Sequence, residues 1–164
     1  GIALPIYQIP TYQYSIYITT EKDVNIPEDW EQVYLYKDWF ITIGTDDKLC
    51  FSSFEFFEEH RDLIIKSQCV FTGEVFDIND NPHSFYHSDE IQMPKGNYRF
   101  DVYGLKRKHP YSEIDRENGN KNYAYLFAFR KVDNDSNENL ERCDNDTHIF
   151  SIEEYWEEVH NNER

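Results

Sequence analysis

The most regular pattern in the chain is an alternation of side chains that begins at residue 97. Three residues take one face and three the other, namely Tyr98, Phe100 and Val102 against Arg99, Asp101 and Tyr103. This two-residue period is that of a β-strand. Pro94 and Gly96 come before it and favour a tight turn. Residues 93–108 are therefore predicted to form a turn and a long strand, with one buried face and one face open to water or a partner.

Further segments show the same period, or a short apolar run bounded by turn residues. The strands predicted in this way cover residues 12–20, 39–43, 49–51, 69–78, 85–91 and 123–129. Residues 123–129 are apolar or aromatic on both faces, which is typical of a central strand. Residues 85–91 alternate poorly and are predicted to form an edge strand.

Helical spacing of apolar residues predicts two or three short helices. One begins near Pro27 and uses Trp30, Val33 and Tyr34; a second runs from Ser52 or Ser53 to about Ile65; a terminal helix covers residues 151–162. A chain of 164 residues has the size of one ordinary domain. We therefore predict one α+β domain over residues 1–164, with a twisted, mainly antiparallel sheet, half-barrel or sandwich-like, against which the helices pack.

The charge of the chain is strongly acidic and unevenly distributed. Thirty-two acidic residues face 16 basic ones, which gives −16. Residues 133–164 hold 11 acidic and 2 basic residues, a difference of −9, and residues 133–147 are predicted to form an acidic loop. Such a chain repels nucleic-acid phosphates and anionic lipids and favours a basic partner. The alternative is that the charge only keeps the protein in solution.

Candidate partner-binding residues lie on the polar face of the strand at 97–108 and in the acidic C-terminal part. They are Asp101, Tyr103, Asp133, Asp135, Glu153, Glu154, Glu157 and Glu158. The acidic members would imitate a polyanion and steer a basic enzyme onto the protein. The alternative is that the four glutamates are only the solvated face of an amphipathic helix, and the sequence leaves both open.

Cysteine usage and hydropathy bear on the compartment. Cys50, Cys69 and Cys143 are odd in number and lack C-x-x-C spacing, and the first two lie in apolar runs. They are expected to be free, buried thiols in a reducing compartment. No apolar run reaches about 18 residues and no signal-peptide pattern opens the chain, so a cytoplasmic protein without membrane contact is predicted.

The motifs of metal sites and catalysis are missing from the sequence. The acidic stretch that begins at Asp133 resembles a calcium loop, but the sixth and twelfth positions hold Glu138 and Asp144 instead of the glycine and glutamate that an EF-hand needs. His83 and His87 lack the helix that would bring them together as zinc ligands. No G-x-S-x-G or H-E-x-x-H motif occurs. We therefore expect no catalytic residue, metal, cofactor or small-molecule ligand, and a hydrolase of unknown type is only a third hypothesis.

One basic cluster supports a different function. Lys106, Arg107, Lys108 and His109 follow the aromatic residues of the strand, so the Tyr98–Lys108 face could bind single-stranded nucleic acid by stacking and charge. The overall charge opposes this hypothesis, and solvated cations at a strand end are the simpler interpretation.

The order of several segments resembles a known family. These are Glu28-Asp29-Trp30, an aromatic strand that ends in Gly44, a short strand at 49–51, and Met93-Pro94-Lys95-Gly96-Asn97-Tyr98. Together they resemble the nuclease-inhibitor family typified by competence protein J, and they are similar to immunity proteins of bacterial contact-dependent growth inhibition systems. The likeness covers residues 12–130. It implies a non-enzymatic cytosolic protein that binds a cognate nuclease toxin and blocks its active site or an adjacent exosite. An exposed sheet edge could add to such an interface by accepting a strand.

Overall fold

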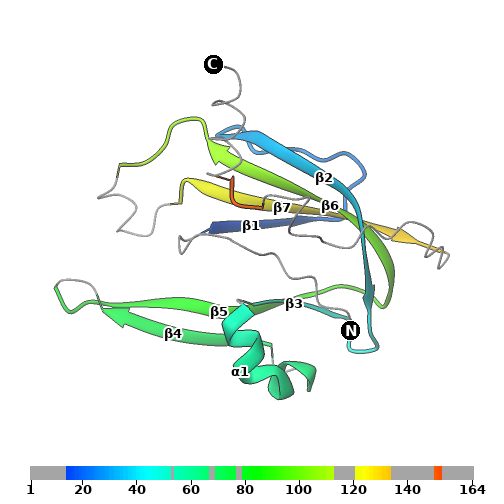
Figure 1. Ribbon diagram of the computed structural model, residues 1–164, viewed down its shortest axis with the longest axis horizontal. Coiled ribbons are helices and arrows are strands. Elements are labelled where there is room, and N and C mark those ends of the chain that lie inside the picture. Colours follow the sequence, from blue (N-terminus) through cyan, green and yellow to red (C-terminus); the bar gives the residue numbers. More distant parts are fainter. Residues whose placement is uncertain are drawn as a thin grey trace. The chain divides into compact units, whose positions relative to one another are not determined.

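The computed structural model describes residues 14–52, 54–66, 69–76, 79–112, 121–133 and 150–152. Most of these residues lie in strands, and one helix accompanies them (Figure 1). In chain order the elements are β1 (Tyr14–Thr19), β2 (Trp30–Ile43), β3 (Lys48–Ser52), α1 (Phe54–Ile65), β4 (Phe71–Phe76), β5 (Pro82–Gln92), β6 (Gly96–Arg107) and β7 (Tyr123–Val132). The chain divides into two compact units, one built on Thr42–Gly96 and the other on the residues before and after that segment.

The second unit contains a four-stranded sheet in the order β1-β7-β6-β2. β1 runs parallel to β7, with Tyr14 opposite Tyr123. β6 runs antiparallel to β7, with Phe100 opposite Phe129. β7 is thus an inner strand, as its apolar character on both faces predicts, and residues 124–129 are all buried.

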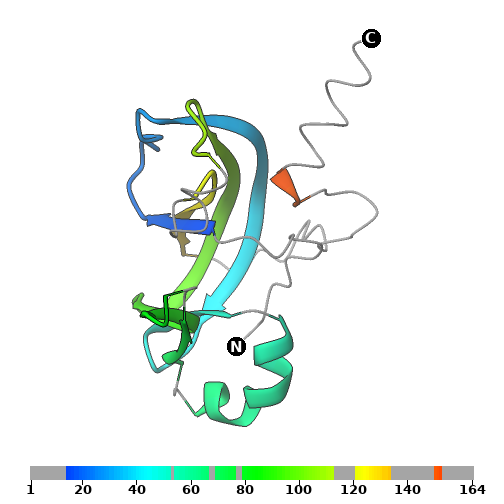
Figure 2. The same cartoon turned by 90° about the vertical axis from the view of Figure 1, so that its left-hand side faces the viewer.

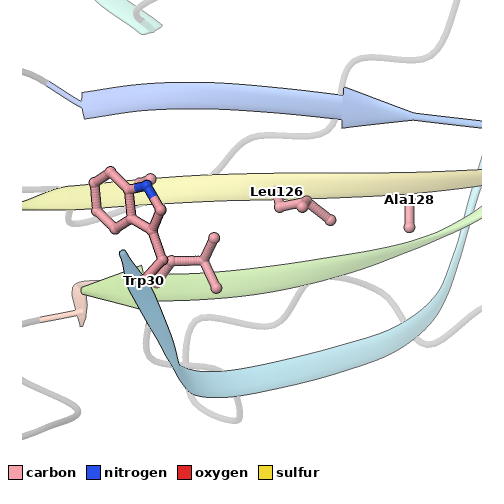
Figure 3. Close-up of a cluster of buried hydrophobic side chains, with 5 residues drawn as sticks. Trp30, Leu126 and Ala128 are labelled. Carbon is pink, nitrogen blue, oxygen red and sulfur yellow. The ribbon is translucent and has the colours of Figure 1, made fainter. Parts of the chain in front are cut away.

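Aromatic side chains dominate one face of this sheet, and small or aliphatic ones the other. The first face buries Tyr98, Phe100, Val102, Tyr125, Phe127 and Phe129. On the opposite face a buried cluster joins Trp30, Leu105, Ala124, Leu126 and Ala128, and Figure 3 shows the Trp30 indole alongside this row. Burial of both faces removes a large apolar area from water, which is the main stabilising contribution to such a sheet.

β2 replaces the short helix predicted near Pro27, so that prediction was wrong. The carbonyl of Pro27 accepts a hydrogen bond of 2.9 Å from the Trp30 amide, which makes one turn, and the chain then becomes extended. The Glu31 carboxylate lies 3.0 Å from the Lys106 ammonium, and the Asp38 amide donates to the Asp101 carboxylate. Residue numbers thus rise along β2 as they fall along β6, so these two neighbouring strands are antiparallel, and Figure 2 shows them side by side. Pairing with β6 and the aromatic content of the segment outweigh the weak helical spacing.

The alternation of buried residues in β2 changes by one position at Asp38. Tyr34 is buried before this point, and Trp39, Ile41 and Ile43 after it. Asp38 has a φ of 64°, in the left-handed region, which Asp tolerates better than most residues. A positive φ together with a change of phase is characteristic of a β-bulge. The bulge lets side chains on both sides of Asp38 reach the same face.

The first unit holds a three-stranded antiparallel sheet in the order β3-β5-β4. β5 is therefore the central strand of this sheet, and its prediction as an edge strand was wrong. β3 pairs with residues 88–92 and β4 with residues 82–88, on opposite sides of β5. Each neighbour covers only part of β5, and these pairings lie outside its own sequence, so its local pattern did not reveal a central strand.

α1 confirms the predicted central helix and packs on the start of β4. The rings of Phe56 and His60 lie 4.9 Å and 5.6 Å from the ring of Phe71. The chain then returns to β3, where Cys50 and Cys69 form a disulfide with their Cα atoms 6.0 Å apart. The expectation of free thiols at these positions was wrong, because sequence spacing does not reveal that α1 brings the two together. The prediction of a cytoplasmic location loses the support of the cysteine argument.

Other predictions concern parts that the structure does not describe. Of the acidic loop at 133–147 only Asp133 is described, and of the terminal helix at 151–162 only residues 151 and 152. The terminal helix and a half-barrel or sandwich-like arrangement stay predictions. No helix of the described segments combines the length and the apolar character that crossing a bilayer requires.

The disulfide makes a testable contribution to stability. It closes a loop with a sequence separation of 19, for which the chain-entropy relation gives about 3 kcal/mol. We expect Cys50→Ser combined with Cys69→Ser to lower the free energy of unfolding by about this amount, measured by urea unfolding. Reductant should destabilise the wild type to a similar degree and leave the double variant unchanged. An equal effect of reductant on both proteins would contradict the assignment.

Candidate functional site: the Phe150 anchor and the acidic C-terminal part

Three residues near the C-terminus are fully buried. Phe150, Ser151 and Ile152 have relative exposures of 1%, 0% and 1%. They lie in the acidic C-terminal part of the chain, between two segments rich in carboxylates. Their burial fixes one point of this acidic part on the four-stranded unit.

Two tyrosine hydroxyls hold the backbone of this point. Tyr34 on β2 and Tyr125 on β7 both donate to the Phe150 carbonyl oxygen, at 2.7 Å and 2.8 Å. A carbonyl oxygen has two lone pairs, and both are used here. Burial, with neighbouring tyrosines contributing, raises the pKa of both hydroxyls far above the usual value, so both remain donors across the ordinary pH range.

Aromatic rings surround the Phe150 side chain. Its centroid lies 5.3 Å from that of Tyr36 and 6.0 Å from that of Trp39. These two residues stand on either side of Asp38, so they meet the same ring only because the bulge changes the phase of β2. We call Tyr34, Tyr36, Trp39, Tyr125 and Phe150 the Phe150 anchor.

Gly104 on β6 provides the space for this arrangement. A Cβ atom at this position would overlap the ring of Tyr34, so any larger residue would push the ring away. Gly104 is opposite Tyr125 in the β6–β7 register, directly under the two hydroxyls. Close approach of a ring to the backbone is a common reason for glycine inside a strand.

A charged cluster stabilises the bulge from the side of β6 and β7. The Arg130 guanidinium donates to the Asp101 carboxylate at 2.6 Å and 3.0 Å and to the Asp38 carboxylate at 3.0 Å. The Asp38 amide donates to the Asp101 carboxylate at 3.0 Å. Burial alone raises the pKa of Asp101, but the hydrogen bonds from Arg130 and the Asp38 amide, with the charge of Arg130, hold this pKa below its usual value. We call Asp38, Asp101 and Arg130 the bulge cluster.

The excess negative charge of the chain lies mainly outside the described residues. The described residues hold 18 acidic and 13 basic side chains, a net −5, so −11 of the −16 belongs to the other segments. Residues 134–149 carry 5 acidic and 1 basic side chains, and residues 153–164 carry the same numbers. The Phe150 anchor therefore attaches two acidic segments to the sheet at the place where they meet.

The basic cluster near the end of β6 is neutralised within the chain. Lys106 pairs with Glu31 at 3.0 Å, and Arg107 with Asp29 at 3.6 Å. The Lys108 ammonium donates to the backbone carbonyl of Glu28 at 2.8 Å. Such pairing leaves little free positive charge for phosphates.

The aromatic residues of the nucleic-acid hypothesis are also unavailable. Tyr98 and Phe100 are 4% and 2% exposed. The Arg107 guanidinium lies over the rings of Trp30 and Tyr111, at 4.6 Å and 4.7 Å from their centroids. Bases cannot stack on buried rings. The geometry therefore weakens the hypothesis that the Tyr98–Lys108 face binds single strands.

One group of possible metal ligands lies in the three-stranded unit. The sulfur atoms of Cys50 and Cys69 and a Glu90 carboxylate oxygen are within 4.8 Å of one another. The two sulfurs are joined in the disulfide, and Glu90 pairs with Lys48 at 2.7 Å. A disulfide has no thiolate to offer a metal ion. This group is therefore structural.

The predicted partner-binding residues have different surroundings. Asp101 is 6% exposed and belongs to the bulge cluster. Tyr103 is half-buried against the cluster around Trp30, and burial raises its pKa. Asp133 is exposed, just after β7. The remaining candidates lie outside the described residues and stay predictions: Asp135, Glu153, Glu154, Glu157 and Glu158.

The sequence reasoning missed the Phe150 anchor. Tyr34 and Tyr36 were assigned to a helix or a linker, and no pattern connects Phe150 with residues more than a hundred positions earlier. The available signal was the aromatic content of residues 30–40, which favours a strand that packs against other rings.

Comparisons with known proteins gave no match: no family model, no curated protein and no solved structure is similar to this chain. The resemblance to nuclease inhibitors and immunity proteins therefore stays a prediction.

The two hydroxyls of the anchor can be removed without changing its shape. We expect Tyr34→Phe and Tyr125→Phe each to lower the free energy of unfolding by about 1 kcal/mol. The double variant should lose at least as much as the two single variants together, because both hydroxyl donors to the buried Phe150 carbonyl are then gone. Urea unfolding measures these differences. Tyr17→Phe is the control, since no hydrogen bond of its hydroxyl is found among the described residues; an equal loss there would contradict the account.

The bulge cluster predicts a dependence of stability on pH. Asp101→Asn should lower the free energy of unfolding by about 1–3 kcal/mol at pH 7, because the Asp101 side chain is 9% exposed and its charge is paired. The pKa of Asp101 is lowered by folding, so its contribution is complete above the unfolded pKa of about 4 and is lost as the pH falls. Wild type and variant should therefore converge in acid. Asp38→Asn is the control. The Asp38 side chain is 62% exposed, so this substitution should lower the free energy of unfolding by less than about 1 kcal/mol.

Proposed function

We propose that this protein is an immunity protein that binds and neutralises a basic nuclease toxin by covering the toxin's active site or an adjacent exosite. The observation that carries this proposal is the Phe150 anchor, which ties two acidic segments to a rigid aromatic sheet. A nuclease that binds nucleic acid presents a positive surface, and two acidic segments joined at one attachment point are complementary to it.

The distribution of cations within the chain favours the same function. Arg107, Lys106 and Arg130 are each engaged by a carboxylate of the sheet unit. These three cations are thus occupied within the sheet unit, and the acidic composition of the C-terminal segments gives the protein a negative field. Such a field raises the association rate of oppositely charged proteins and is sensitive to salt.

The anchor also holds one point of the acidic part, residues 150–152, on the sheet unit. A chain that is attached at such a point before binding loses less conformational entropy in a complex than an unattached chain does. Two buried hydrogen bonds and the rings around Phe150 fix the midpoint, so both acidic segments start from a known place on the sheet. A tail that served only solubility would not need such attachment.

The test uses the cognate toxin, which we expect to be a small basic nuclease domain encoded by the neighbouring reading frame. We expect one equivalent of the protein to abolish its nuclease activity. We also expect Glu157→Lys combined with Glu158→Lys to weaken binding at least about tenfold at low salt, or about 1.4 kcal/mol, mainly through slower association. Stopped-flow association rates and calorimetry, at low and high salt, measure both effects.

A matched control separates a local effect from net charge. Glu21→Lys combined with Asp23→Lys changes the charge by the same amount at two exposed positions between β1 and β2. This variant should bind nearly as the wild type does. Equal losses for the two pairs would show that only net charge matters, and full nuclease activity in the presence of excess protein would overturn the proposal.

A further inference from the structure

The hairpin of β4 and β5 extends beyond the rest of its sheet. β3 pairs only with residues 88–92 of β5, whereas β4 pairs with residues 82–88. Residues 72–76 and 82–86 therefore form a two-stranded ribbon, and Figure 1 shows it continuing past the end of β3. Within the described part of the chain, no strand lies beside either edge of this ribbon.

The two ends of the ribbon differ in how well they are supported. At its root, the Phe71 ring packs under α1, the disulfide joins Cys50 to Cys69, and Ser88 donates to the Cys69 carbonyl at 2.6 Å. Beyond the root, Thr72, Glu74, Phe76, Pro82 and Ser84 are all exposed. An unsupported two-stranded ribbon is at best marginally stable, and a third strand would stabilise it.

The outer edge of β4 has only part of the usual protection against strand pairing. Natural edge strands commonly carry lysine or proline, and Phe71–Phe76 contains neither; its protection consists of Glu74 and of the register shift between Phe71 and Thr72. Apolar side chains are exposed at both ends of β4: Phe76 is 64% exposed, and Val70, just before the strand, is 51% exposed. An edge with free backbone groups and exposed apolar side chains is suited to strand addition.

The charge around the ribbon selects the kind of strand that can add. Residues 67–94 contain 5 acidic residues and no lysine or arginine. A second copy of this ribbon would bring the same negative charge to the edge and would be repelled. Glu74 and Phe76 are two positions apart and share one face of β4, so a strand with a lysine or arginine and, two residues further on, an apolar residue would complement both.

We propose that the outer edge of β4 accepts a cationic extended strand of a partner protein, with Phe76 as its apolar contact and Glu74 as its charge contact. The inference rests on the proposed function to the extent that the strand belongs to the nuclease toxin. It assigns to the three-stranded unit a second contact surface, distinct from the acidic C-terminal part. Main-chain hydrogen bonds supply affinity at such an edge, and alternate side chains supply selectivity.

A peptide probe tests the edge without the toxin. A short peptide that repeats Lys-Thr-Val-Thr, so that lysine and valine share one face, should slow amide hydrogen exchange in β4 and shift the β4 resonances in NMR spectra. The same peptide with glutamate in place of lysine should change neither. Because no nuclease is present, success or failure here is independent of whether the protein inhibits the neighbouring toxin.

Exposed positions provide variants that keep the fold. Phe76→Ser should weaken binding of the lysine peptide about tenfold, because an aromatic contact is lost. Ile16→Ser is the matched control, at an apolar residue with 50% exposure on β1, and should bind the peptide as the wild type does. Glu74→Lys should weaken binding of the lysine peptide and allow the glutamate peptide to bind. Unchanged thermal unfolding of each variant would show that the sheet is intact.

Three outcomes would overturn the proposal. The first is that the lysine peptide slows amide hydrogen exchange outside β4, for instance in the acidic C-terminal part. The second is an equal loss of binding in Phe76→Ser and Ile16→Ser. The third is a concentration-dependent dimer, seen by sedimentation and abolished by Phe76→Ser, because the edge would then be covered by a second copy of the chain. If the lysine peptide binds at β4 but the protein does not inhibit the toxin, the strand site is confirmed and the immunity function is refuted.

Discussion

The buried carbonyl of Phe150 is the constraint on which the four-stranded unit depends. A buried acceptor needs donors, and the hydroxyls of Tyr34 and Tyr125 supply them from two different strands. This requirement fixes where β2 must bring its tyrosine, and Gly104 leaves room for the ring. It also fixes the acidic C-terminal part of the chain at one point. The two hydrogen bonds to Phe150 therefore determine where the acidic segments are attached to the sheet.

The bulge at Asp38 connects this packing with the electrostatics of the sheet. The left-handed backbone there changes the phase of β2, so that aromatic residues on both sides reach Phe150. The same residue receives Arg130, which in turn holds Asp101. The bulge thus links the packing around Phe150 with the ion pairs of Arg130.

The candidate site could be predicted only in part. The alternation over 97–103 correctly assigned Tyr98, Phe100 and Val102 to a buried face. It treated Asp101 as open to a partner, because alternation cannot show that Arg130 from the next strand covers its carboxylate. The disulfide escaped prediction for a similar reason, since only the path of α1 brings Cys69 to Cys50. Each of these contacts joins residues that are distant in the sequence.

The sequence by itself determined the strand content, the central position of β7, the helix α1 and the concentration of acid after residue 133. These features depend on local periodicity and composition, which a single chain displays directly. Only the tertiary structure decided that residues 30–36 form a strand, that β5 is central, and that Phe150 returns to Tyr34. Hydrogen-bond partners and buried faces in a sheet come from other strands, so the same local pattern can satisfy several arrangements until those strands are in place.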